Sequence, residues 1–288
     1  MVTPVSIHVC GSVNLDLVTT CARLPEAGET VLGGAFAKHP GGKGANQALA
    51  ARRLGAEVRL IARTGDDAEA EAALALLRAD GADLSLCRAV QGETTGVALI
   101  AVDASGDNQI VVAPGANATL TIADLPGTIE GALIGQLEVP AAVLDAAAQR
   151  CTGLVVINLA PAGPVPESLI ARADLLVVNE TEAAVYGRDR LLAAGGRVAI
   201  TLGARGAVLF EDGVEIARAA PPKVDVVDAT GAGDAFTGAI TVALIEDMAP
   251  DRALAFACAA AAASTTRPGA QTALPRRAEV DALLDARS

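Results

Sequence analysis

Hydrophobic residues fall into blocks along the chain, and the spacing within each block predicts a strand or a helix. The apolar runs typical of buried strands are residues 5–9, 58–62, 131–137, 153–158, 175–178 and 197–202. The segments with apolar residues at helical spacing are residues 44–54, 68–78, 141–150, 168–173, 236–244 and 253–263. Because strands and helices alternate, we expect residues 1–288 to form a single doubly wound α/β domain, in which helices flank a mainly parallel sheet.

Four further segments interrupt this alternation and predict a second, smaller sheet. Their residues alternate between polar and apolar, or are rich in strand formers, and they are residues 13–18, 28–32, 95–102 and 109–112. The last two flank the turn-forming residues 103–107, which predicts a hairpin. We therefore expect a β-sheet lid formed by inserts at about residues 13–37 and 94–113.

The composition excludes several classes of protein. Of the 288 residues, 52% are hydrophobic, which is enough for a sizeable core and excludes a disordered chain. Aromatic residues make up only 2%, so a surface that binds by stacking bases is not expected. The net charge of -12 opposes binding to nucleic acid and to an anionic membrane, and we expect neither partner.

The cysteines, the histidines and the chain start indicate a cytoplasmic protein. The five cysteines are scattered without CxxC spacing, which is typical of reduced thiols. Only two histidines are present, which excludes a histidine-rich metal site. The N-terminus lacks a basic segment followed by a long apolar run, and the most apolar window, residues 253–263, is shorter than the roughly 20 residues that span a bilayer.

One stretch combines a glycine-rich turn with two acids. Gly231, Ala232 and Gly233 lie between Asp228 and Asp234, and helical spacing begins directly afterwards. The turn thus leads into a helix N-terminus, where backbone N–H groups and the helix dipole favour an anion. An acid there suits the transfer of a phosphoryl group to a hydroxyl, whose proton Asp234 accepts. Alternatively, Asp234 is an N-cap and the glycines only form a turn.

Two other segments carry side chains that suit a small polar ligand. Asn14 and Asp16 share one face of their expected strand, where they bind the hydroxyls of a polyol or simply form a solvated face. Gly42 begins a glycine-rich turn, and Lys43 and Asn46 lie three residues apart, so they can face one ligand. The turn is not a Walker A loop, because Gly-x4-Gly-Lys-Ser/Thr is missing.

Several polar segments directly follow expected strands and so share one edge of the sheet. These are Glu138, Asn179 with Glu182, residues 203–206 and residues 228–234. In open α/β sheets, ligands bind at the carboxyl ends of the strands. This convergence favours the role of base over that of N-cap for Asp234.

The ordered set of motifs resembles the ribokinase-like (PfkB-type) carbohydrate kinases over nearly the whole chain. GGKGANQA at residues 41–48 is similar to the N-terminal signature of that family, and DATGAGDAF at residues 228–236 is similar to its C-terminal signature. The other similar motifs are GSVNLD at 11–16, TGDD at 64–67, GETTGVA at 92–98, GANA at 115–118, NETE at 179–182, TLGARG at 201–206 and GAQ at 269–271. The resemblance implies a sugar kinase that converts MgATP and D-ribose to ADP and ribose 5-phosphate.

The resemblance also implies roles for the matching residues. Those implied for the sugar are Asn14, Asp16, Gly42, Lys43, Asn46, Glu138 and an apolar wall of Ala98 and Ile100. Asp234 is the implied base, and the N–H groups of Gly231, Ala232 and Gly233 form the implied anion hole. The residues implied for ATP are Asn179, Glu182, Thr201, Leu202, Gly203, Ala204, Arg205, Gly206, Gly233 and Cys258, with Glu182 reaching Mg²⁺ through water.

The resemblance further implies an activating monovalent cation, usually K⁺, beside the anion hole. Its implied ligands, partly main-chain carbonyls, are Asp228, Thr230, Ser264, Arg267, Gly269 and Ala273. Oxygen ligands suit such a hard ion, although Asp228 could instead cap a turn. The resemblance also implies a homodimer in which two lids clasp each other.

The chain departs from the family pattern in four places, of which a change in the loop at residues 158–161 is minor. Cys258 stands where a nucleotide-contacting His or Asn is common, which puts the packing of adenine in doubt. Ala273 stands where a cation-site Ser is common, and Thr272 beside it is a substitute ligand. The segment 186–197 is shorter than usual, so we expect a trimmed helix there.

Two alternatives to a D-ribose kinase remain open at this point. The acceptor could be 2-deoxyribose, another pentose or a nucleoside, although a nucleoside needs room and an aromatic platform that the few aromatic residues hardly supply. The protein could instead be a sugar sensor on a kinase fold. A sensor is expected to lose the base or the anion hole, and both are present in this sequence.

Overall fold

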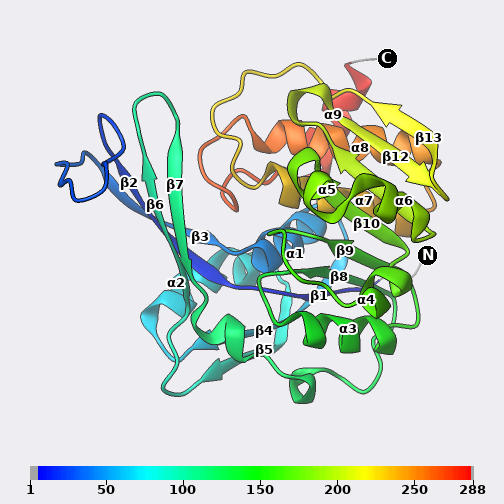
Figure 1. The fold of residues 1–288 in the computed structure, drawn as a ribbon, viewed down its shortest axis with the longest axis horizontal. Helices are drawn as coiled ribbons and strands as arrows, with labels where there is room; N and C mark the ends of the chain where they lie inside the picture. Colours follow the sequence, from blue (N-terminus) through cyan, green and yellow to red (C-terminus); the bar gives the residue numbers. More distant parts are fainter. Residues whose placement is uncertain (1–5, 287–288) are drawn as a thin grey trace.

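A nine-stranded sheet runs through the centre of the structure, a computed structural model that describes residues 6–286 (Figure 1). Its strands lie in the order β13-β12-β11-β10-β9-β8-β1-β4-β5. Their bounds are β1 Ser6–Cys10, β4 Glu57–Gly65, β5 Asp83–Val90, β8 Ala132–Gln136, β9 Val155–Asn158, β10 Leu175–Asn179, β11 Arg197–Thr201, β12 Ala207–Glu211 and β13 Val214–Ala219. All neighbours from β5 to β11 are parallel, whereas β12 and β13 are antiparallel at one edge.

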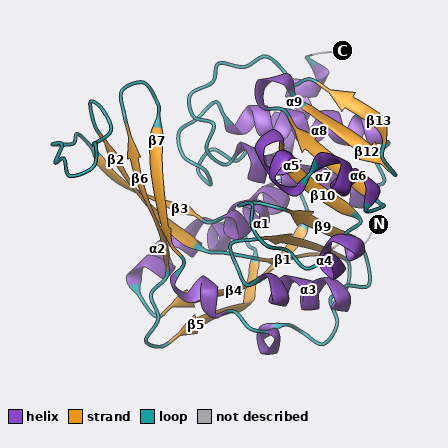
Figure 2. Ribbon diagram, in the orientation of Figure 1, coloured by secondary structure: helices purple, strands orange, loops and turns teal. Residues whose placement is uncertain are grey.

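Helices cover both faces of this sheet and bury one hydrophobic core on each face (Figure 2). On the first face lie α1 Lys43–Arg53, α2 Ala68–Ala79, α7 Ala232–Ile245, α8 Pro250–Ser264 and α9 Arg277–Asp285. On the second lie α3 Ala141–Arg150, α4 Glu167–Arg172, α5 Glu180–Tyr186 and α6 Arg188–Ala193. Side chains alternate between the two cores along each strand, as Ile7, Val9 and Cys10 of β1 do, because successive residues of a strand point to opposite faces. The sequence-based fold class is confirmed.

A separate four-stranded sheet stands beside the main sheet and forms the lid (Figure 1). Its order is β3-β2-β6-β7, with β2 Asn14–Thr20, β3 Phe36–Gly41, β6 Gly96–Val102 and β7 Asn108–Ala113. Strands β2 and β6 pair in parallel, while the two outer pairs are antiparallel. In this register Asp16 lies opposite both Ala98 and His39, so the lid brings segments about 80 residues apart in sequence next to each other.

The structure corrects two expectations for the strands. Residues 28–32 do not form a strand. The lid strand is instead Phe36–Gly41, which extends past residue 37, where the insert was expected to end. Gly28 has a φ of 83° and Leu32 is 92% exposed, so this segment finds no sheet to bury its apolar side chains. The edge strand β5 was not expected, because its partly exposed residues lack a clear period.

Candidate active site

Strands β1 and β8 are neighbours in the sheet, and the chain turns in opposite directions from them, which makes their carboxyl ends a topological switch point. Ser12 follows β1 and Glu138 follows β8, and the Ser12 hydroxyl donates a hydrogen bond to the Glu138 carboxylate. The same carboxylate accepts the Lys43 N–H at 3.0 Å, and the Gly44 N–H donates to the Ser12 Oγ at 3.2 Å. The first turn of α1 is therefore tied to the sheet at the point where ligands bind in such folds.

Glycine is required where the chain enters α1. Gly42 has a φ of 88°, and a Cβ atom on it would lie 2.7 Å from the Asn14 backbone nitrogen. The close approach of this turn to β2 brings the start of α1 beside Asn14 and Asp16. The turn thus joins the two segments that the sequence suggested for one polar ligand.

Asp234 lies in the first turn of α7 with its side chain directed to α1. Its carboxylate accepts one hydrogen bond from Asn46 Nδ2 at 2.8 Å and one from Gln47 Nε2 at 2.9 Å, and it is only 6% exposed. The N-cap of α7 is Gly231, with a left-handed φ of 78°. Asp234 is therefore not the N-cap, and its carboxylate is available to a ligand between the two helix starts.

The start of α7 presents backbone donors. Within residues 6–286, the N–H groups of Gly231 and Gly233 have no hydrogen-bond acceptor, whereas the Ala232 N–H donates to the Ala229 carbonyl at 3.2 Å. Apart from its chain neighbours and the nearby backbone of α7, nothing lies within 4 Å of where a Cβ on Gly233 would stand, so the space beside this residue is open. Two of the three N–H groups expected in an anion hole are thus free to bind an anion.

Three carboxylates surround one ammonium group. The carboxylate of Asp234 raises the pKa of Lys43 most strongly, burial opposes the rise, and Glu138 and Glu182 add to it. Lys43 therefore stays protonated at neutral pH. The pKa of Asp16 is raised to about 7, chiefly by burial, and the nearby charges of Glu138 and Asp234 contribute to the same rise.

The lid places Asn14 and Asp16 on one face of β2, close to α1. Asn14 is buried, and its Oδ1 accepts from Asn117 Nδ2 at 2.8 Å, so its own Nδ2 is the group left to face a ligand. Asn117 also exchanges hydrogen bonds with the Val13 backbone at 2.9 and 3.1 Å. Asn117 lies in a motif that the sequence highlighted without giving it a role, and the structure makes it the residue that orients Asn14.

The remaining sugar-side residues lie around this group. Ala98 is buried next to Asp16, and Ile100 lies two residues further along β6, opposite Val18 and on the same face of the lid. Asn46 Oδ1 is buried and has no hydrogen-bond partner among the described residues. A buried acceptor of this kind is costly unless a ligand or a water satisfies it.

The segments expected to bind ATP follow β10 and β11. Asn179 caps α5, and its Oδ1 accepts the Glu182 N–H at 2.8 Å while the Glu182 carboxylate accepts the Asn179 N–H at 2.8 Å. Burial raises the pKa of Glu182, and the Asn179 hydrogen bond and the charge of Lys43 oppose that rise. Residues 201–206 form the end of β11 and a tight turn, closed by the Leu202 N–H on the Gly206 carbonyl at 2.7 Å.

Cys258 lies further away, on α8. Its thiol is buried and approaches the Ala219 carbonyl of β13 at 3.7 Å. The structure thus places Cys258 between α8 and β13. Arg205, from the turn after β11, forms an exposed ion pair with Glu180.

The segments expected to bind a monovalent cation meet behind the start of α7. The Asp228 carboxylate accepts the Thr230 N–H at 2.8 Å and the Gly269 N–H at 2.7 Å, and these bonds outweigh burial and lower its pKa. Arg267 donates to the Ala273 carbonyl at 3.1 Å, so that oxygen already has a cationic partner. Oxygen donors therefore gather here as a hard cation requires, but Ala273 fits as a ligand least well.

Other oxygens of this region are engaged locally. The Ser264 hydroxyl donates to the Ala261 carbonyl at 2.8 Å, and the Thr272 hydroxyl donates to the Pro268 carbonyl at 2.8 Å. The described part of the chain contains no group of three or more His, Cys, Asp and Glu side chains that could hold a metal ion by themselves. A cation here would therefore need main-chain carbonyls in addition to the Asp228 carboxylate.

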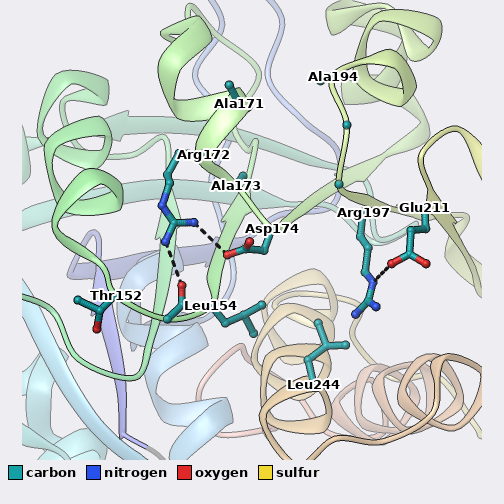
Figure 3. Close-up of a pocket in the computed structure, with 13 residues that line it drawn as sticks. Thr152, Leu154, Ala171, Arg172, Ala173, Asp174, Ala194, Arg197, Glu211 and Leu244 are labelled. Atoms are coloured by element: carbon teal, nitrogen blue, oxygen red, sulfur yellow. Dashed lines mark hydrogen bonds and ion pairs between the residues drawn. The ribbon is translucent and has the colours of Figure 1, made fainter.

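A groove of about 710 Å³ lies at the opposite edge of the sheet, where β9, β10 and β11 begin (Figure 3). Its charged side chains pair with each other, Arg172 with Asp174 at 3.0 Å and Arg197 with Glu211 at 2.8 Å. None of the sequence-predicted site residues lines it. We therefore assign the candidate active site to the carboxyl edge and not to this groove.

Across residues 6–286, none of the helices has the length and apolar character needed to cross a bilayer.

Comparisons with known proteins identify the family of this chain. Residues 5–277 match the model of the pfkB family carbohydrate kinases. The chain is 38% identical over 292 residues to the ribokinase of Bacillus subtilis, covering 97% of this chain and 99% of that one. Among solved structures, Thermotoga maritima ribokinase superposes with a TM-score of 0.89 at 32% identity, covering 98% of this chain and 99% of that one. Arabidopsis thaliana ribokinase complexed with ribose and ATP superposes with a TM-score of 0.87 at 29% identity and the same coverage. The chain therefore belongs to the pfkB family of carbohydrate kinases.

Proposed function

We propose that this protein transfers the γ-phosphoryl group of MgATP to the 5-hydroxyl of D-ribose. Family membership makes it a sugar kinase, and the ribokinases among its relatives support ribose as the acceptor. The observation that carries the proposal is Asp234, which is buried at the start of α7 and held by Asn46 from the start of α1. A base is thereby fixed between the sugar side and the free N–H groups of the α7 turn.

The sugar is held by the polar groups that the lid and α1 bring together. Asp16, Glu138 and the unpartnered Asn46 Oδ1 accept hydroxyl protons, and Asn14 Nδ2 donates to a hydroxyl oxygen. The backbone of Gly42 and the ammonium of Lys43 close the pocket, and Ala98 and Ile100 form its apolar wall. Each hydroxyl thus meets a group that is already oriented before binding.

Asp234 accepts the proton of the 5-hydroxyl as the new oxygen–phosphorus bond forms and the bond to ADP breaks. The N–H groups of Gly231 and Gly233 then stabilise the charge on the transferred phosphoryl group, with Lys43 beside them. Ala232 contributes less than the sequence implied, because its N–H already donates to Ala229.

The nucleotide lies along the ends of β10 and β11. Asn179 and Glu182 face the phosphates, Glu182 holding Mg²⁺ through water, and the turn formed by residues 201–206 lines the base and ribose of ATP. Bound Mg²⁺ neutralises the phosphate charge during transfer. Cys258, buried on α8 with its thiol near the Ala219 carbonyl, would contribute to this side by packing.

A monovalent cation, K⁺, would be held beside the turn before α7 and would raise activity by stabilising that turn. Asp228, Thr230 and the carbonyls of Ser264, Arg267 and Gly269 supply oxygens, and Ala273 contributes least because Arg267 occupies its carbonyl. Asp228 links the turn to Gly269, so a cation here acts on the anion hole directly. The proposal predicts higher activity in K⁺ than in Na⁺.

The lid has a second role, in assembly. Its exposed apolar side chains are Phe36, Leu99, Ile110, Val111 and Val112. Such a surface is unusual for a sheet that faces water on both sides and suits contact with a second lid. We therefore propose that the chain acts as one domain with a lid and works as a homodimer in the cytoplasm, where ATP is available.

A coupled assay of ADP release tests this function. D-ribose, 2-deoxyribose, another pentose and a nucleoside are compared as acceptors, in K⁺ and in Na⁺, and the position of the new phosphate is determined. We expect D-ribose to give the highest kcat/KM with the phosphate on the 5-hydroxyl. Ribose binding without ADP release would contradict the enzymatic function, and a higher kcat/KM for a nucleoside would change the acceptor.

A further inference from the structure

Three buried amide side chains form a hydrogen-bonded chain behind Asp234. Gln47 comes from α1, Gln136 from the end of β8 and Asn158 from the end of β9. Gln47 Nε2 donates to Asp234 Oδ1 at 2.9 Å and to Asn158 Oδ1 at 3.1 Å, and Gln136 Nε2 donates to Gln47 Oε1 at 2.7 Å. Gln47 and Gln136 are both 0% exposed, so water does not compete with these bonds.

The direction of this chain is set by a backbone carbonyl. Asn158 Nδ2 donates at 3.1 Å to the carbonyl of Val177, which can only accept. Asn158 must therefore turn its Oδ1 toward Gln47, and Gln47 must turn its NH₂ group toward Asn158 and Asp234. The Gln47 Oε1 then faces Gln136, whose NH₂ group meets it. The Val177 carbonyl of β10 thus determines how all three amide side chains are oriented.

Close packing of α1 on α7 allows Gln47 to reach Asp234. A Cβ on Gly238 of α7 would lie 2.8 Å from the Ala50 Cβ and 3.1 Å from the Gln47 carbonyl, so glycine is needed at this contact. The two helices are therefore held at a separation at which the Gln47 side chain can donate to the carboxylate. Neither Gln47 nor Gln136 has a role in the function proposed above.

We propose that Gln47 is a positioning residue for Asp234, and that Asn158 and Gln136 fix the direction in which Gln47 donates. This inference rests on the proposed function, in which Asp234 takes the sugar proton. With Asn46 on one oxygen and Gln47 on the other, the carboxylate cannot rotate about its bond to Cβ. The remaining lone pairs then point in fixed directions toward the hydroxyl, which is the geometry that proton transfer requires.

The sharpest test changes Gln136, which is two hydrogen bonds away from any reacting atom. An ionised carboxylate at this position only accepts, so Gln136→Glu forces Gln47 to turn its NH₂ group away from Asp234 and to present its carbonyl oxygen instead. When protonated, the same carboxyl can donate as the amide does. The methionine in Gln136→Met donates no hydrogen bond and is only a weak acceptor, so it leaves the orientation of Gln47 to Asn158.

We expect Gln136→Glu to lower kcat roughly 10- to 100-fold at pH 8, and the loss to shrink as the pH falls. Gln136→Met should lower kcat by less than about 5-fold, equally at every pH, since the Asn158 bond remains. The KM for ribose should change less than about 3-fold in both, because neither alters a sugar contact. If Gln136→Met lowers kcat as much as Gln136→Glu does at pH 8, the amide chain does not orient the base. The same holds if the loss of kcat in Gln136→Glu is independent of pH.

A second variant tests Gln47 directly. Gln47→Leu removes the bond to Asp234 Oδ1 and should lower kcat roughly 10- to 100-fold while calorimetric binding of ribose persists. Because loss of a donor disfavours an ionised carboxylate, the acid limb of the kcat profile should move to higher pH. Gln149→Leu on the exposed face of α3 is the matched control and should change neither.

The outcomes separate this inference from the proposed function. If the unaltered protein releases no ADP with ribose, the proposed function fails, and with it the role of Asp234 as base. If the unaltered protein is active and the Gln47 and Gln136 variants keep its kcat and pH profile, only the positioning role is overturned. Thermal unfolding of each variant shows whether a loss of kcat comes instead from unfolding.

Discussion

The two halves of the candidate site differ in how their polar groups are satisfied. On the sugar side, Asp16, Asn46 and Asp234 are buried, and the hydrogen bond between Asn46 and Asp234 joins residues 188 positions apart in the chain. On the nucleotide side, Asn179 and Glu182 bond mainly to each other, within one helix start. The loop before the anion hole even leaves Val226 66% exposed and Val227 62% exposed.

This difference indicates that the sugar side is formed in advance and the nucleotide side is open. Buried polar groups are costly unless they are paired, and the sugar side is held by long-range hydrogen bonds between α1 and α7 and between Asn117 and Asn14 of the lid. A local helix cap and a tight turn need no such support. Substitutions on the sugar side should therefore have larger effects, on both catalysis and stability, than those on the nucleotide side.

The largest effect is expected at Asp234. Asp234→Asn removes the base, and kcat should fall by roughly 10²- to 10⁴-fold. The single amide oxygen of the variant can accept from only one of the two donors, Asn46 Nδ2 or Gln47 Nε2. Stopped-time ADP assays with D-ribose give kcat, and calorimetry gives ribose affinity. Asp285→Asn, on an exposed residue at the end of α9, is the control. Near-normal turnover of Asp234→Asn would show that Asp234 is not the base.

The next effect concerns stability and pH. The pKa of Asp16 is raised to about 7 from an ordinary 3.8, chiefly by burial, so the folded state favours the protonated carboxyl. Its contribution to the free energy of unfolding is therefore full below pH 4 and is lost as the pH rises through 7, by at most about 4 kcal/mol. Urea denaturation between pH 5 and 8 should show this loss in the unaltered protein. In Asp16→Asn, the free energy of unfolding should fall less steeply as the pH rises.

The same substitution should weaken sugar binding. A hydrogen bond to an ionised acceptor is replaced by one to a neutral amide, so Asp16→Asn should raise the KM for ribose by roughly 10-fold or more, with a smaller change in the KM for ATP. In the unaltered protein, the KM for ribose should rise as the pH falls below 7, and in the variant it should not. An unchanged KM would show that Asp16 does not contact the sugar.

The smallest effect is expected on the nucleotide side. Glu182→Gln keeps the capping hydrogen bond and removes one charge, so the KM for MgATP should rise by less than about 10-fold and the KM for ribose should stay the same. Titrating Mg²⁺ at fixed ATP measures the change. If Glu182→Gln raises the KM for MgATP by a larger factor than Asp16→Asn raises the KM for ribose, the contrast between the two halves is wrong.

The sequence by itself determined the fold class and predicted most residues of the candidate site. Buried strands of Val, Ile and Leu and helices of regular spacing give strong local signals, and the motifs around Lys43 and Asp234 carry the chemistry within a few residues. It failed where the local signal was weak: the lid strand Phe36–Gly41, expected at residues 28–32, and the unexpected edge strand β5.

Only the tertiary structure decided which groups meet. Ser12, Gln47 and Asn117 lie in motifs visible in the sequence, yet their partners Glu138, Asp234 and Asn14 are 126, 187 and 103 residues away. Hydrogen bonds across such distances depend on strand order and on the close packing of α1 against α7, which no local pattern encodes. Local periodicity thus determined which elements form, while burial and long-range packing determined how each polar side chain is oriented.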